Sequence, residues 1–134
     1  NGPVAILELP KPFKVDISVV NNRLRIFGSG DKVEIDNPQF EEIYDVYCPN
    51  QIEAMKFLTP SITTKFIDLY TKYGFMFEFK VFGKNMYFRF HSGDLFVPNP
   101  TNPREEAIGV ALYFEILEGI KEIMNEVIVT MKKL

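Results

Sequence analysis

The residues PSITTKFIDLYTKYGFMFEFKVFGKNMYFRF (60–90) change from a helical to a strand-like spacing of apolar side chains. In the first half, the apolar and aromatic residues recur on one helical face: Ile62, Phe66, Leu69, Tyr70 and Tyr73. Gly74 follows directly, and glycine is typical of the position just past a helix end. In the second half, apolar residues alternate on both sides of the turn residues Gly83-Lys84-Asn85. The stretch therefore predicts an amphipathic helix followed by a β-hairpin with a Phe-rich inner face.

The N-terminal part of the chain alternates in a way that predicts strands. Residues 13–19 place apolar side chains on every second position, which is the period of a half-buried strand. Asn21-Asn22 suits a tight hairpin turn, after which residues 23–27 are expected to return as a second strand. Residues 4–9 and 32–35 are expected to form two shorter strands.

Four X-Pro steps predict the starts of helices, because proline is favoured at the first helical position. They are Asn37-Pro38, Cys48-Pro49, Thr59-Pro60 and Asn102-Pro103. After the first step the apolar spacing is helical as far as Tyr47, and unwinding into extended chain near Asp45 is left open. Between the second and third steps, Ile52, Met55 and Leu58 are expected to face inward.

The C-terminal segment 102–134 predicts one long helix with an apolar stripe. The stripe residues are Tyr113, Leu117, Ile120, Met124, Val127, Met131 and Leu134. Such a helix would be ~45 Å long, whereas a globule of this size has a diameter of about 36 Å. The helix is therefore expected to overhang the domain or to break, with Gly109 and Gly119 as the candidate breaks. The stripe is expected either to pack lengthwise on the sheet or to join two copies as a homodimer.

Strands and helices that are segregated along a chain favour an α+β fold. We expect a curved, mainly antiparallel sheet, two or three middle helices, a Phe-rich hairpin and a long C-terminal helix. The chain is interpreted as one soluble domain, 1–134, because 134 residues suffice for one core but not for two. Its parts are strands over 1–35, a helical middle over 37–74, a β-hairpin over 75–97 and a helix over 102–134.

Composition excludes several classes of protein. With 46% hydrophobic and 25% charged residues the chain is not disordered, and a net charge of −3 offers no basic field for nucleic acid. Its longest uncharged apolar run, 107–114, is far shorter than the ~20 residues of a membrane span. The single cysteine, Cys48, cannot form an internal disulfide. One cysteine and one histidine are also too few ligands for a structural zinc site, which normally has four. No metal and no cofactor are therefore expected.

Three segments carry a resemblance to a known family: FEEIYDVYCPNQIEAMKFLTPSI from Phe40, FEFKVFGKNMYFRF from Phe77 and DLFVP from Asp94. In order and spacing they resemble the bacterial domain of unknown function 3137, over about half of the chain, Val33 to Pro98. Members of that family tend to carry hydrophobic segments before this region. The resemblance therefore implies the soluble C-terminal part of a longer protein, held at the cytoplasmic side of a bacterial membrane by an N-terminal anchor outside this chain.

The chain departs from that family's pattern near its first helix. The pattern has serine and aspartate where this chain has Cys48 and Asn50, and arginine where it has Met55. Without that arginine, Glu53 lacks its obvious cationic partner, which puts a site based on such an ion pair in doubt. The family supplies an architecture and no activity.

Two polar constellations have plain interpretations that we favour. Seven acidic residues lie between residues 31 and 53, and such a patch could bind a divalent cation or a basic partner. We favour a solvated acidic surface, because the residues do not have the spacing of an EF-hand. His91-Ser92-Gly93-Asp94 is typical of a hairpin exit, since adjacent residues rarely form a catalytic triad. Cys48 is expected to be a modestly reactive or inert thiol, because no histidine or basic residue lies near it in the sequence.

Two hypotheses of function remain. The first is a non-enzymatic binding or scaffolding domain, with self-association through Tyr113, Leu117, Ile120, Met124, Val127 and Met131. The second is a small-ligand-binding domain or enzyme with a pocket under the aromatic sheet. The candidate binding residues are Tyr44, Tyr47, Gln51, Glu53 and Arg89. A deep pocket with converging polar groups would favour the second hypothesis.

Overall fold

The computed structural model describes residues 4–24, 31–74, 76–91 and 103–133, and of residues 4–5, 90–91, 103–110 and 112–113 only the backbone. The described strands form one six-stranded sheet in the order β1-β6-β5-β2-β4-β3, and neighbours in it pair antiparallel. The strands are β1 (Val4–Glu8), β2 (Ile17–Asn21), β3 (Asp31–Val33), β4 (Tyr44–Cys48), β5 (Met76–Phe82) and β6 (Asn85–His91).

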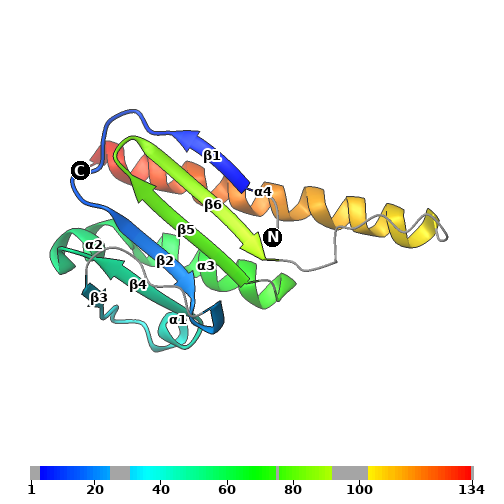
Figure 1. Cartoon of the computed structure of the whole chain (residues 1–134), viewed down its shortest axis with the longest axis horizontal. Helices are drawn as coiled ribbons and strands as arrows, with labels where there is room; N and C mark the ends of the chain where they lie inside the picture. Colours follow the sequence, from blue (N-terminus) through cyan, green and yellow to red (C-terminus); the bar gives the residue numbers. More distant parts are fainter. Residues whose placement is uncertain (1–3, 25–30, 75, 92–102, 134) are drawn as a thin grey trace.

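The helices pack on one side of this sheet (Figure 1). They are α1 (Pro38–Ile43), α2 (Gln51–Phe57), α3 (Pro60–Tyr73) and α4 (Pro103–Lys133), and a 3₁₀ turn, η1 (Asn22–Leu24), follows β2. The predicted α+β class, antiparallel sheet and long C-terminal helix are confirmed.

The helix and hairpin of residues 60–90 form as the sequence predicts. Thr59 caps α3 by accepting a hydrogen bond from the backbone N–H of Ile62, and Gly74 ends it with a φ of 71°. The turn between β5 and β6 contains Gly83 at a φ of 61°, a conformation that glycine adopts without strain. Phe66 lies at the centre of the core, with ring centroids 5.4 Å from Phe79 and 6.1 Å from Phe88.

The predicted N-terminal hairpin is wrong. β2 begins at Ile17, and Asn21 ends the strand where a turn was expected, while Arg23 belongs to η1. The expected strand residues 25–27 lie outside the described part of the chain. All five residues of β2 are buried, because the strand is flanked by β5 and β4 in the middle of the sheet. A central strand of this kind does not show the half-buried pattern that alternation suggests.

Two of the four proline signals are confirmed in full. Asn37 caps α1 and Thr59 caps α3, each followed by proline. The prediction at Cys48-Pro49 is wrong, since Cys48 ends β4 and α2 begins two residues after Pro49, where Asn50 caps it through the Glu53 N–H. α4 begins at Pro103 as predicted, and Asn102 lies outside the described residues.

The inward face of α2 also differs from the prediction. Ala54, Phe57 and Leu58 are buried, whereas Ile52 is 67% and Met55 48% exposed. The reason is the rotation of this short helix, which is set by the contact of Phe57 with rings of the core rather than by its own sequence spacing.

α4 is continuous, and its N-terminal part extends beyond the sheet and the other helices (Figure 1). Neither Gly109 nor Gly119 breaks it, so the predicted overhang is the alternative that occurs. A Cβ atom on Gly119 would lie 2.8 Å from Cδ1 of Leu69, which shows how closely α3 and α4 approach there. Buried residues that α4 adds to the core are Ile116, Ile120, Ile123, Met124, Val127 and Met131.

Candidate functional site

Tyr44, the first candidate binding residue, lies inside the core. Its side chain is 1% exposed, and its hydroxyl donates a hydrogen bond to the carbonyl oxygen of Phe66 at 2.9 Å. Burial, with a smaller contribution from the neighbouring Tyr70, raises the pKa of this hydroxyl far above its usual range. The residue therefore links β4 to α3 and is not accessible to a ligand.

Tyr47 and Arg89 lie on the opposite face of the sheet from Tyr44. Paired residues on neighbouring strands share a face, so Tyr47 lies on the same face as Ser18, and Ser18 on the same face as Lys80. Glu78, two residues before Lys80 on β5, shares this face and pairs with Arg89. Tyr44 is three residues from Tyr47 on β4 and therefore points to the other face. Tyr47 is buried and Arg89 is exposed.

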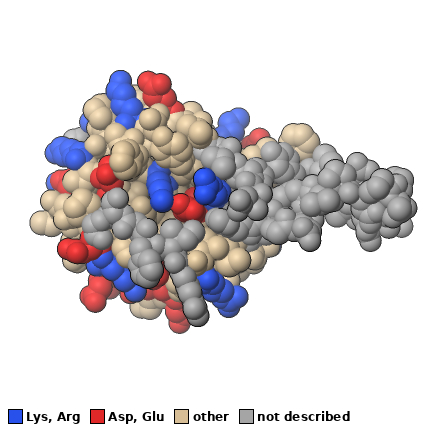
Figure 2. All heavy atoms as spheres, in the orientation of Figure 1, with Lys and Arg blue, Asp and Glu red and all other residues tan. Residues whose placement is uncertain are grey.

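This outer face of the sheet carries paired charges. Lys80 lies 3.0 Å from Glu78, and Lys32 lies 3.3 Å from Asp45. On the side of the molecule seen in Figure 2, the described cations and acids are interspersed and form no large area of one sign.

Gln51 and Glu53 lie on the first turn of α2. Gln51 is exposed, and Glu53 lies 3.7 Å from Lys56 of the same helix. The five candidate residues therefore occupy three places: the core, the outer face of the sheet and α2. The space under the aromatic strands, where a pocket was the second hypothesis, is filled by core rings that include Phe57 and Phe66.

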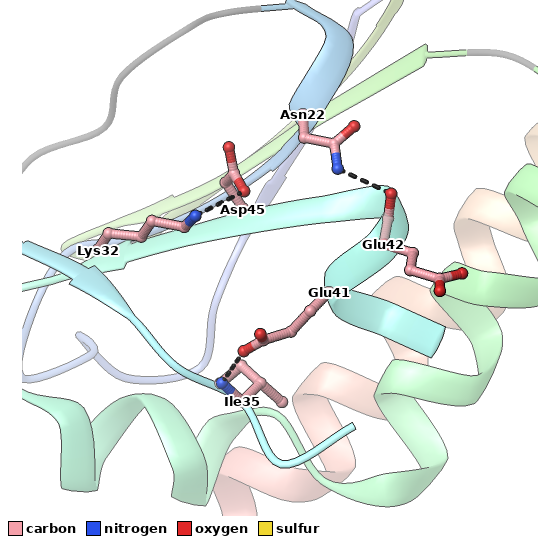
Figure 3. A network of polar contacts seen from close by, with 6 residues as sticks. All are labelled: Asn22, Lys32, Ile35, Glu41, Glu42 and Asp45. Carbon is pink, nitrogen blue, oxygen red and sulfur yellow. Dashed lines mark hydrogen bonds and ion pairs between the residues drawn. The ribbon is translucent and has the colours of Figure 1, made fainter. Parts of the chain in front are cut away.

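Two of the acids of residues 31–53, Glu41 and Asp45, make contacts at one corner of the sheet (Figure 3). Glu41 of α1 accepts a hydrogen bond from the backbone N–H of Ile35, while Asp45 of β4 pairs with Lys32 of β3. Figure 3 shows these two carboxylates directed at different partners. Within the described ranges, no group of three or more histidine, cysteine or acidic residues could hold a metal ion.

Cys48 is buried at the end of β4. Its thiol is 1% exposed and donates a hydrogen bond to the carbonyl oxygen of Asn50 at 3.3 Å. Burial raises the pKa of the thiol, and the carboxylates of Glu53 and Asp16 add to this, against a lowering by the hydrogen bond. The geometry gives this thiol a structural role.

A small cavity of about 130 Å³ lies beside Glu53, where α2, α4 and the loop before β2 meet. Its lining residues are Lys11, Pro12, Phe13, Lys14, Glu53, Lys56 and Met131. Three cations thus surround one carboxylate. Glu53 was a candidate from the sequence, whereas the three lysines were not, because they are spread over more than forty residues of chain and carry no spacing signal.

A larger feature is an open groove of about 800 Å³ between α3 and α4, which we call the α3–α4 groove. Its lining residues are Lys65, Asp68, Leu69, Thr71, Lys72, Tyr73, Ala111, Phe114, Glu115, Glu118, Gly119 and Glu122. The α4 wall carries three glutamates, and the α3 wall carries two lysines and one aspartate. The hydroxyl of Tyr73 donates to Glu115 at 3.4 Å across the groove.

The groove was not predictable from the sequence, because it depends on which faces of two helices far apart in the chain meet. One signal was present: Phe114 ends the uncharged run 107–114, and its ring is 61% exposed in the structure.

Most of the α4 residues that were predicted to mediate self-association pack into the core of a single copy. Ile120, Met124, Val127 and Met131 are buried in the core, and Leu117 is half-buried. The side chain of Tyr113 lies outside the described part. Self-association through this stripe stays a prediction, and it would require these side chains to leave the core.

Among the described residues, no helix combines the length and the apolar character needed to cross a membrane. A family model described as "Protein of unknown function (DUF3137)" matches residues 1–131, which is nearly the whole chain. No curated protein and no solved structure matches the chain.

Proposed function

We propose that this chain, which belongs to the DUF3137 family of proteins of unknown function, is a non-enzymatic binding domain that contacts a protein partner through the α3–α4 groove. The observation that carries the proposal is the groove itself: about 800 Å³, open, and edged by charged side chains with an exposed Phe114. Small-molecule sites are usually enclosed and mainly apolar, whereas an aromatic residue within a polar rim is typical of protein interfaces.

The domain is proposed to act as part of a longer protein that is anchored at the cytoplasmic side of a bacterial membrane. This part of the proposal is supported by the family resemblance alone. Protease added to spheroplasts that make the full-length gene product should leave the domain intact until the membrane is permeabilised. Digestion in intact spheroplasts would place the domain on the other side.

A photo-crosslinking experiment tests the groove as a binding surface. A photoreactive amino acid replaces Thr71, which is exposed and lines the groove, or Gln39, which is exposed on α1 and serves as the matched control. Irradiation of cells should yield discrete protein adducts from position 71 and few from position 39. Equal adducts from both positions would refute binding in the groove.

A second candidate function is small-anion binding in the cavity beside Glu53, and it deepens the ligand-binding hypothesis. The favouring observation is the convergence of Lys11, Lys14 and Lys56 on about 130 Å³, a volume suited to a phosphate or a small carboxylate. Inorganic phosphate titrated into the chain should give saturable amide shifts around Lys14, and Lys56→Gln should weaken them. Shifts that grow linearly, or equally in both proteins, would count against this site.

A further inference from the structure

We infer that the occupant of the α3–α4 groove is a second copy of this chain, an inference that rests on the proposed binding function of the groove. The two copies are related by a twofold axis, and the Phe114 ring of each enters the groove of the other. In such an interface the same surface must be complementary to itself.

The N-terminal part of α4 extends past the end of α3. α3 and α4 run antiparallel, because Leu69 approaches Gly119 and the later Tyr73 approaches the earlier Glu115. Since α3 ends at Tyr73, the part of α4 that precedes the groove has no α3 beside it. From Pro103 to residue 110 that part is ~10 Å long at 1.5 Å per residue.

The composition of this region of α4 also favours a covered helix. Residues 107–114 carry no charge on any side of the helix, a composition typical of helices that are covered all round. At its end, Phe114 is 61% exposed, and Ala111, one turn earlier, is exposed as well. A large ring next to a small residue on one helix face suits close approach of another helix.

Charged residues have the same spacing on the two walls of the groove. On α3, Lys65, Asp68 and Lys72 are separated by three and four residues. On α4, three glutamates repeat that spacing: Glu115, Glu118 and Glu122. Residues seven apart are ~10.5 Å apart along a helix, so the outer glutamates of one copy can face the outer lysines of the other.

This match favours a second copy over an unrelated partner. An occupant of the groove must complement both walls, and a second copy can do so because it carries a lysine row and a glutamate row with the same spacing. Asp68 lies opposite in sign to its two lysine neighbours, so the pairing is carried by the ends of the rows, and charge complementarity of this kind sets orientation and partner choice.

Sedimentation of the chain tests the inference, with two exposed phenylalanines as a matched pair. Phe114 is 61% exposed in the groove, and Phe82 is 57% exposed at the end of β5, outside it. We expect the unaltered chain to sediment as a dimer, Phe114→Glu to raise the dissociation constant about tenfold or more, and Phe82→Glu to leave it unchanged. Circular dichroism should show both variants folded, because both rings are largely exposed.

A charge exchange gives a second, independent readout. Lys65→Glu with Lys72→Glu should weaken the dimer, and adding Glu115→Lys with Glu122→Lys should restore it. A chain that stays monomeric at about millimolar concentration overturns the inference. So does equal weakening by Phe114→Glu and Phe82→Glu, or a charge exchange without rescue.

The crosslinking experiment separates this failure from failure of the proposed function. If the chain is monomeric but position 71 forms adducts with another protein, the groove binds a partner that is not a second copy. If position 71 forms no specific adducts and the chain is monomeric, both the proposed function and this inference fail.

Discussion

The substitution Tyr44→Phe tests whether Tyr44 is a structural residue of the core. It removes one hydroxyl, which is buried and donates to the Phe66 carbonyl at 2.9 Å, and it leaves the ring in place. A buried hydrogen bond contributes about 1 kcal/mol net to the free energy of unfolding. In a chain of this length that corresponds to a melting temperature lower by about 3–5 °C at neutral pH.

The pH dependence of this difference provides the sharper test. Burial raises the pKa of the Tyr44 hydroxyl in the folded chain above its ordinary value of 10.0. Above pH 10 the unfolded chain therefore releases this proton while the folded chain retains it, and the free energy of unfolding falls as the pH rises. At pH 11 the loss from this group is about 1.4 kcal/mol relative to pH 8.

Tyr44→Phe lacks this loss, so the two proteins should converge in stability as the pH rises. Urea unfolding followed by circular dichroism at pH 8, 10 and 11 measures the effect, and all other titrating groups cancel in the comparison. A wild-type advantage of about 1 kcal/mol at pH 8 should vanish or reverse by pH 11. A constant difference over this range would show that the hydroxyl ionises as readily in the folded chain as in the unfolded one.

Three further outcomes test the packing. Phe66→Ala should lower the free energy of unfolding by about 3–5 kcal/mol in urea titrations, because it empties the centre of the aromatic core, and a loss below 1 kcal/mol would be inconsistent with that position. A maleimide should modify Cys48 at least about a hundredfold more slowly in the folded chain than in urea, because the thiol is buried and its pKa is raised. Comparable rates of modification in the two conditions would contradict the burial of the thiol. Gly119→Ala should not raise the melting temperature despite a gain in helix propensity of about 1 kcal/mol, because the new methyl group would meet Leu69; a clear rise would show that α3 and α4 approach less closely.

Local features of the fold were predictable because they depend on neighbours in the sequence. The cap at Thr59, the helix end at Gly74 and the alternation of Phe77 and Phe79 each involve residues within a few positions of one another. Their physical causes, backbone capping, a positive φ angle and the two faces of a strand, act at that range. The α+β class follows from the order of such elements.

Features that depend on distant residues were predicted poorly. β2 pairs with β4 and β5 rather than with the segment after it, so the expected hairpin at Asn21 does not form. Cys48-Pro49 resembles a helix start, yet Cys48 ends a strand that is held between β2 and β3. A helix start and a strand end can both satisfy the local backbone hydrogen bonds at this position. Only the pairing of β4 with β2 and β3 determines that Cys48 belongs to a strand.

The candidate site shows the same division. Glu53 was a candidate from the sequence, whereas Phe114, the exposed end of the uncharged run 107–114, was not. The sequence could not identify the α3–α4 groove, in which facing residues such as Tyr73 and Glu115 are more than forty positions apart in the chain. By itself, therefore, the sequence determined the helix and hairpin of residues 60–90, the fold class and the long apolar C-terminal helix. The tertiary structure alone decided that the apolar stripe of α4 packs into the core of the same copy and that a charged face with Phe114 is left to line the groove beside α3, because the partner of a helix face depends on residues far apart in the chain.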